Sequence, residues 1–118
     1  MPRSRNIKPA FFANENLADL PPETRLLFIG LWCLADKEGR LEDRPRRIGA
    51  FLFPYESHDV EGMIDDLGGS DFLVRYEAGG VRYIQITNFT KHQSPHCKEQ
   101  DSTIPAPDMH GASTGQAP

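Results

Sequence analysis

Apolar residues repeat with a helical period up to about residue 67 of this chain and with a strand period after that. Within residues 24–35 they cover nearly the whole circumference of a helix, which predicts a central helix that opens at a proline pair and buries Trp32. Two shorter helices are predicted, at 45–53 before a proline and at 59–67, where the apolar spacing is i, i+3, i+4, i+7. A helical turn capped by Asn14 should precede all three, and Ser57 or Asp59 should cap the helix at 59–67. Gly30 is expected to let a neighbouring element approach the central helix closely. Gly39 is expected to end that helix in a left-handed conformation, and Gly68-Gly69 to end the helix at 59–67.

Residues 72–87 alternate as a β-hairpin does around the dipeptide Gly79-Gly80. Both positions of a type I′ turn need a positive φ, which glycine adopts without steric cost. A two-residue turn places Tyr76 opposite Tyr83 as a cross-strand aromatic pair and Glu77 opposite Arg82. Residues 40–42 are interpreted as an extended link or a minimal first strand.

Helices followed by a two-stranded hairpin predict an α+β domain of the winged-helix type, with a core of about three helices and a β-hairpin wing. We assign residues 1–10 to a basic N-terminal arm, 11–92 to the winged-helix domain and 93–118 to a polar tail. From Gln100 onward the large apolar residues are Ile104 and Met109 alone. We expect the tail to be disordered, because so little apolar surface does not offset the entropy of ordering it.

Charge is unevenly distributed along the chain. The net charge is −4, yet residues 1–98 carry 13 basic and 14 acidic side chains, so the domain is nearly neutral. The overall basic signature of a nucleic-acid-binding protein is therefore missing. Any affinity for DNA has to come from local basic patches.

Sequence features of secreted, membrane and catalytic proteins are missing as well. The two cysteines, Cys33 and Cys97, form no disulfide framework, which fits a reducing cytoplasm. No stretch approaches the roughly 20 apolar residues of a membrane span, and the N-terminus lacks the apolar segment of a signal peptide. The sequence also lacks a P-loop, a G-x-S-x-G and an H-E-x-x-H motif.

His92, His96 and Cys97 are residue types that bind zinc, but no second pair follows at a regular spacing. A solvated or hydrogen-bonded histidine pair is the favoured interpretation. We therefore predict a non-catalytic protein with no metal and no cofactor.

Three runs of residues resemble a known family: LLFIGLWCLADKEGRLEDRPRRI, FPYESHDVEGMIDDL and VRYIQITNFTKHQSPHCKE. Together they look like the N-terminal domain of phage replication proteins of the replisome-organiser type. The resemblance covers about residues 4–99 and is most specific from Tyr83 to Glu99. It implies a winged-helix domain and a role in DNA replication in the cytoplasm of a bacterial host cell. In such proteins a separate C-terminal region often recruits the host helicase or its loader.

Basic side chains gather on the arm, around the start of the second helix, on the wing and after it. The predicted DNA-binding residues, which should contact mainly the phosphate backbone, are Arg3, Arg5, Lys8, Arg40, Arg44, Arg46, Arg47, Arg75, Arg82, Lys91 and Lys98. The N-terminus of the helix at 45–53 also favours a phosphate. The alternatives are a frayed, solvated arm and scattered solubilising charge.

The helix at 59–67 is acidic, although in a helix-turn-helix the second helix of the pair enters the major groove. It has no Lys, Arg, Asn or Gln, so base reading by this helix is disfavoured. Four of its residues are instead predicted to contact a protein partner: Asp59, Glu61, Asp65 and Asp66. The alternative is a solvated polar face.

The leading hypothesis is a DNA-binding winged-helix protein of phage type that acts in the initiation of replication. The alternative is a protein-interaction winged helix that oligomerises or docks onto replisome or transcription partners. A transcriptional regulator is a third and weaker class. No membrane partner is expected.

Overall fold

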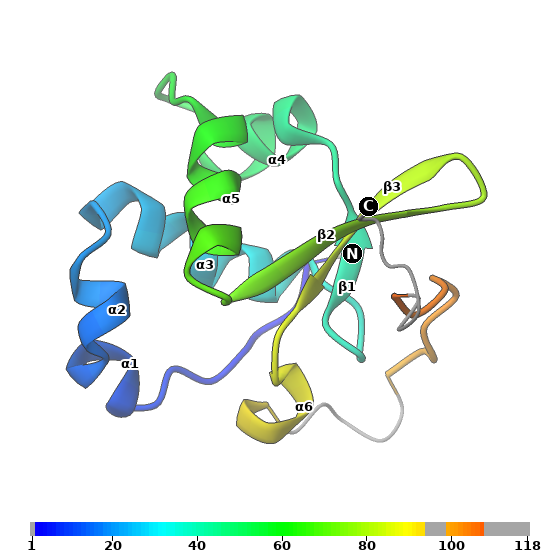
Figure 1. Ribbon diagram of the computed structural model, residues 1–118, viewed down its shortest axis with the longest axis horizontal. Coiled ribbons are helices and arrows are strands. Elements are labelled where there is room, and N and C mark those ends of the chain that lie inside the picture. Colours follow the sequence, from blue (N-terminus) through cyan, green and yellow to red (C-terminus); the bar gives the residue numbers. More distant parts are fainter. Residues whose placement is uncertain (1, 94–98, 108–118) are drawn as a thin grey trace.

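The computed structural model describes residues 2–93 and 99–107. In that part of the chain, six helices and a three-stranded antiparallel sheet form an α+β domain (Figure 1). In chain order the elements are α1 (Ala10–Ala13), α2 (Glu15–Ala18), α3 (Pro22–Leu34), β1 (Arg40–Glu42), α4 (Pro45–Leu52), α5 (Val60–Gly69), β2 (Leu73–Ala78), β3 (Val81–Ile86) and α6 (Phe89–His92).

The sheet has the strand order β1-β3-β2, and its hairpin has the predicted register. Tyr76 lies opposite Tyr83 with the ring centroids 5.7 Å apart. Gly79 and Gly80 have φ values of 58° and 80°, as a type I′ turn requires. The predicted minimal strand also forms, since β1 pairs with β3. The hairpin and the first strand are therefore confirmed.

The hydrophobic core lies where α3 and α5 pack against the sheet. Leu27 and Leu31 of α3 and Ile64 of α5 are fully buried, as is Ile84 of β3. Trp32 is 8% exposed, which confirms its predicted burial. Figure 1 shows α3, α4 and α5 on one side, with the β2–β3 hairpin extending away from them.

Gly30 lets α3 and α4 approach closely, as its place in the middle of α3 predicted. A Cβ atom at this position would lie 2.5 Å from Leu52 Cδ1 of α4. Asn14 has its predicted capping role, and of the two predicted candidates Ser57 and Asp59 it is Asp59 that caps α5. Asn14 Oδ1 accepts hydrogen bonds from two backbone N–H groups of α2, and Asp59 accepts one from Gly62 N–H.

Two helix ends differ from the predictions. Gly68 and Gly69 were expected to end the third helix, but α5 runs through Gly69, and Asp71 takes the left-handed conformation with φ of 64°. The N–H groups of Asp71 and Phe72 donate to carbonyls of the last turn, and these bonds end the helix beyond the glycines. The predicted stop at Gly39 is also displaced. Its φ is 81°, but it lies in the link between α3 and β1.

Described residues of the predicted tail contact the rest of the domain, while its residues 94–98 and 108–118 lie outside the described ranges. Gln93 is buried, and its side-chain amide pairs with the backbone of Asn6, accepting from N–H at 2.9 Å and donating to O at 2.7 Å. Residues 99–107 lie against the domain, where Ile104 O accepts from Arg40 and Pro105 O from Tyr76. Polar contacts hold this part of the predicted tail. The prediction of disorder rested on the low apolar content of this segment, and apolar content does not reveal polar contacts of this kind.

Candidate nucleic-acid interface

The first turn of α4 carries the most accessible group of arginines. Arg44, Arg46 and Arg47 are exposed, and this turn holds no acidic residue. Arg44 Nε lies 2.5 Å from Glu42 Oε1. Arg46 and Arg47 have no ion-pair partner in the part of the chain that the structure describes. These two side chains are therefore accessible to an external anion.

A groove of about 460 Å³ runs beside this turn, between β1, α4 and the segment 99–107. Four predicted basic residues line it: Arg3, Arg40, Arg44 and Arg47. Asp36, Glu42 and Asp101 line it too, so its charge is mixed. Arg40 is partly engaged, because Nε donates to Gln85 Oε1 at 2.8 Å and Nη1 to Ile104 O at 3.3 Å. Arg3 Nε lies 3.1 Å from Glu99 Oε1.

Arg5, one of the predicted DNA contacts, is engaged inside the protein. Its side chain is 5% exposed and forms an ion pair with Glu99, with Nη2 2.9 Å from Oε1. Nε donates to Trp32 O at 3.0 Å, and the guanidinium lies 5.1 Å from the ring centroid of Phe89. A buried charge that is already paired is not available to a phosphate.

Arg75 is also engaged inside the protein rather than on a DNA-binding wing. It holds Asp43 in two hydrogen bonds, of 2.6 Å from Nε and 2.8 Å from Nη2, and its Nη1 lies 2.7 Å from both Glu61 and Asp65. Burial alone would lower the pKa of the guanidinium, but the hydrogen bonds to these carboxylates hold its pKa above the ordinary value. No signal in the sequence pointed to Asp43, which lies 32 positions away.

Arg82 stays more than half exposed and faces the same acidic group. Its Nη2 lies 3.6 Å from Asp43 and 3.7 Å from Glu61. The register places Arg82 opposite Glu77, as predicted, but the ion pairs are with Asp43 and Glu61 instead. Arg82 is therefore screened by acidic neighbours and is a poor phosphate ligand.

The acidic surface of α5 is smaller than the sequence indicated. Asp59 caps the helix, while Glu61 and Asp65 face Arg75. Asp66 is exposed and has no partner among the described residues. Three of the four predicted interaction residues are therefore engaged within the domain, and the charge of Asp66 is the most accessible of the four.

The remaining predicted basic residues lie elsewhere on the molecule. Lys8 and Lys91 are exposed, near α1 and on α6, at the opposite end from α4 (Figure 1). Lys98, like His96 and Cys97, lies outside the described residues. Within the described ranges, the basic side chains therefore do not join into one continuous surface.

No three His, Cys, Asp or Glu side chains gather as metal ligands within residues 2–93 and 99–107. None of the helices described is long and apolar enough to span a membrane. Comparisons of the chain with protein-family models, with curated proteins and with solved structures found no match.

Proposed function

We propose that this chain is a winged-helix domain that binds DNA without catalysis, and that it acts in phage-type replication initiation in a bacterial cytoplasm. The order of its elements supports the winged-helix assignment. A strand separates α3 from α4, and α5 leads directly into the β2–β3 hairpin, whose second strand pairs with β1.

The observation that carries the DNA-binding proposal is the pair Arg46 and Arg47 on the first turn of α4. Both are exposed and unpaired among the described residues, whereas Arg5 and Arg75 are engaged in the interior. No described side chain caps α4, and Pro45 has no N–H, so the N–H groups of Arg46 and Arg47 are the ones that remain open to a phosphate oxygen. Phosphate neutralisation supplies most of the affinity of proteins for DNA.

Binding through α4 should be largely independent of sequence. Base reading needs side chains that match the edges of the bases, such as Arg for guanine and Asn for adenine. The outward positions of α5 hold Asp65 and Asp66, which repel a groove lined by phosphates. The contacts proposed here are therefore to the DNA backbone.

The test compares duplex binding of the wild type with that of Arg46→Ala/Arg47→Ala by fluorescence anisotropy over a range of salt concentrations. The slope of log K against log salt should flatten by about 0.9 for each phosphate that the variant no longer neutralises. Arg82→Ala/Lys91→Ala is the matched control, because it also removes two exposed cations and should leave the slope nearly unchanged. An equal weakening in both double variants would show that only net charge matters, and would refute α4 as the interface.

Exposed apolar side chains favour a second function, docking onto a protein partner. Tyr55 is 96% exposed in the loop between α4 and α5, and Phe51 and Leu26 are more than half exposed. Large apolar groups left in water are typical of interaction sites when they cluster. Sedimentation of the wild type and of Phe51→Ser/Tyr55→Ser, alone and with replisome proteins, would reveal an assembly that depends on these two side chains.

A further inference from the structure

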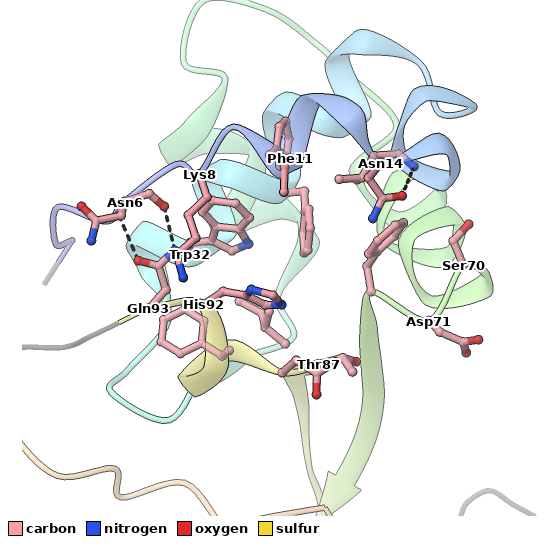
Figure 2. A pocket seen from close by; sticks show the side chains of 17 residues that line it. Asn6, Lys8, Phe11, Asn14, Trp32, Ser70, Asp71, Thr87, His92 and Gln93 are labelled. Carbon is pink, nitrogen blue, oxygen red and sulfur yellow. Dashed lines mark hydrogen bonds between the residues drawn. The ribbon is translucent and has the colours of Figure 1, made fainter.

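A cavity of about 290 Å³ lies on the side of the domain away from α4. The N-terminal arm, α1, α2, α3, the link between α5 and β2, the end of β3 and α6 surround it (Figure 2). Its walls are aromatic and include Phe11, Phe28, Trp32, Phe72 and Phe89. Phe28 joins two of the others, with ring centroids 5.2 Å from Trp32 and 5.3 Å from Phe72. The cavity is therefore a hollow in an aromatic cluster.

Three polar groups at the rim, Asn14 Nδ2, the His92 ring and the Lys8 ammonium, have no partner among the residues that the structure describes. Figure 2 shows the amide of Asn14 and the ring of His92 directed toward the cavity from different sides. Asn14 uses Oδ1 to cap α2, which leaves its Nδ2 without a hydrogen bond in the described ranges. Lys8 also lines the cavity, is exposed and has no ion pair in that part of the chain. The carboxylate of Asp71 is turned away from the cavity (Figure 2).

We propose that this cavity binds one nucleobase, with the attached phosphate against Lys8. Its volume is close to the lower limit of ligand pockets, about 300 Å³, and so fits one planar ring system. Aromatic side chains stack on bases of any sequence. Asn14 Nδ2 and the His92 ring then meet polar atoms on the edge of the base, and Lys8 pairs with the anion. A wholly apolar ligand would leave all three groups unused.

The nucleotide belongs to a single strand of DNA. This assignment of its source rests on the proposed DNA-binding function. A base within a duplex is stacked and paired, so it enters such a cavity only after leaving the helix. α1 and α6, which line the cavity, lie at the opposite end of the molecule from α4 (Figure 1). They therefore form two separate sites, and each can be tested without the other.

Trp32 is the one tryptophan of the chain and lines the cavity, so its fluorescence reports on what enters. Titration with dTMP or dAMP should quench it to saturation. Thymidine, which lacks the phosphate, should bind about tenfold more weakly because it loses the charge-assisted contact with Lys8. Ribose 5-phosphate, which lacks the base, should not quench. Absence of saturable quenching by both nucleotides would overturn the proposal.

Variants of exposed residues test the site without disturbing the core. Ala10→Phe places a ring in the cavity and should abolish quenching, while Lys8→Ala should weaken nucleotide binding about tenfold. Lys91→Ala is the matched control, since Lys91 is exposed on α6 next to His92 but does not line the cavity. Equal quenching in Ala10→Phe and in the wild type would place the nucleotide elsewhere and refute the site.

Two further titrations separate this inference from the proposed function. An oligo(dT) single strand should quench Trp32 at lower concentration than dTMP, and failure to quench would overturn the single-strand source. The peptide-like probe N-acetylphenylalanine amide should not quench; quenching by it and not by nucleotides would reassign the cavity to an aromatic side chain of a partner protein.

Arg46→Ala/Arg47→Ala should keep nucleotide quenching while losing duplex binding. If the wild type binds duplex DNA but nucleotides do not quench Trp32, the cavity site alone is refuted. If nucleotides quench Trp32 and the Arg46→Ala/Arg47→Ala variant binds duplex DNA as well as the wild type does, the α4 interface alone is refuted.

Discussion

Arg5 and Glu99 lie 94 positions apart in the sequence, yet they form an ion pair in which both side chains are almost fully buried, 5% and 7% exposed. The pair joins the N-terminal arm to the segment 99–107. It also caps α3, because Arg5 donates to the carbonyls of Trp32 and Ala35 at the C-terminal end of that helix. A cation at this position is favourable for the helix dipole.

Replacing Arg5 by Ala should lower the free energy of unfolding by about 3 kcal/mol or more, because it leaves Glu99 and two helix carbonyls without this donor. Glu99→Gln should cost less, about 1 kcal/mol, since the amide still accepts hydrogen bonds. Urea unfolding followed by circular dichroism measures both. The exposed Arg46→Ala is the control and should be near neutral. If the loss of unfolding free energy in Arg5→Ala/Glu99→Gln equals the sum of the losses in the two single variants, the two residues are not coupled.

Stability should fall in acid because of Glu99. The hydrogen bond from Arg5 lowers the pKa of this carboxyl below its ordinary 4.5, against the opposing effect of burial, and the charge of Arg3 adds to the shift. The charged form is favoured in the folded state. Its contribution is therefore complete above the unfolded pKa of 4.5 and is lost as the pH falls through the lower folded value.

The measurement is the urea midpoint at a series of pH values from about 6 down to about 3, for the wild type and Glu99→Gln. The variant lacks the titrating group and should lose less stability over that range. Parallel curves for the two proteins would contradict the assignment.

Arg75→Lys should destabilise the domain by about 2 kcal/mol although the charge is kept. Asp43 is buried and held in two parallel hydrogen bonds that need the planar guanidinium. Arg82→Lys is the matched control on the next strand. Its contact with Asp43 is 3.6 Å and its side chain is exposed, so the change should stay within about 0.5 kcal/mol. Equal effects at the two positions, measured by urea unfolding, would remove the special role of Arg75.

Gly39→Ala should cost about 2–3 kcal/mol in the free energy of unfolding. The backbone there has φ of 81°, and a Cβ would lie 2.5 Å from Phe89 Cβ, which is in the core and cannot turn aside. Gly79→Ala is matched in conformation, with φ of 58°, but a Cβ there meets no atom within 4 Å among the described residues. It should therefore cost only the backbone strain, about 1 kcal/mol. Thermal unfolding of both variants separates steric clash from conformational strain.

The local elements of this domain could be predicted because their causes are local. The hairpin register follows from a two-residue glycine turn, which alone sets Tyr76 opposite Tyr83. Asn14 and Asp59 cap helices that begin within three residues of them. The exception is the end of α5, where the carbonyls of the last turn, and not the two glycines, decided the boundary.

The sequence by itself determined where the helices, the turn and the charges lie along the chain. Only the tertiary structure decided which charges are accessible. Arg5 and Arg75 look no different from Arg46 and Arg47 in the sequence, but Glu99 and Asp43, distant along the chain, bind the first two. The aromatic cavity was equally invisible, since its aromatic walls come from α1, α3, the link before β2 and α6. Both features depend on which distant segments the fold brings together, and no local pattern records that.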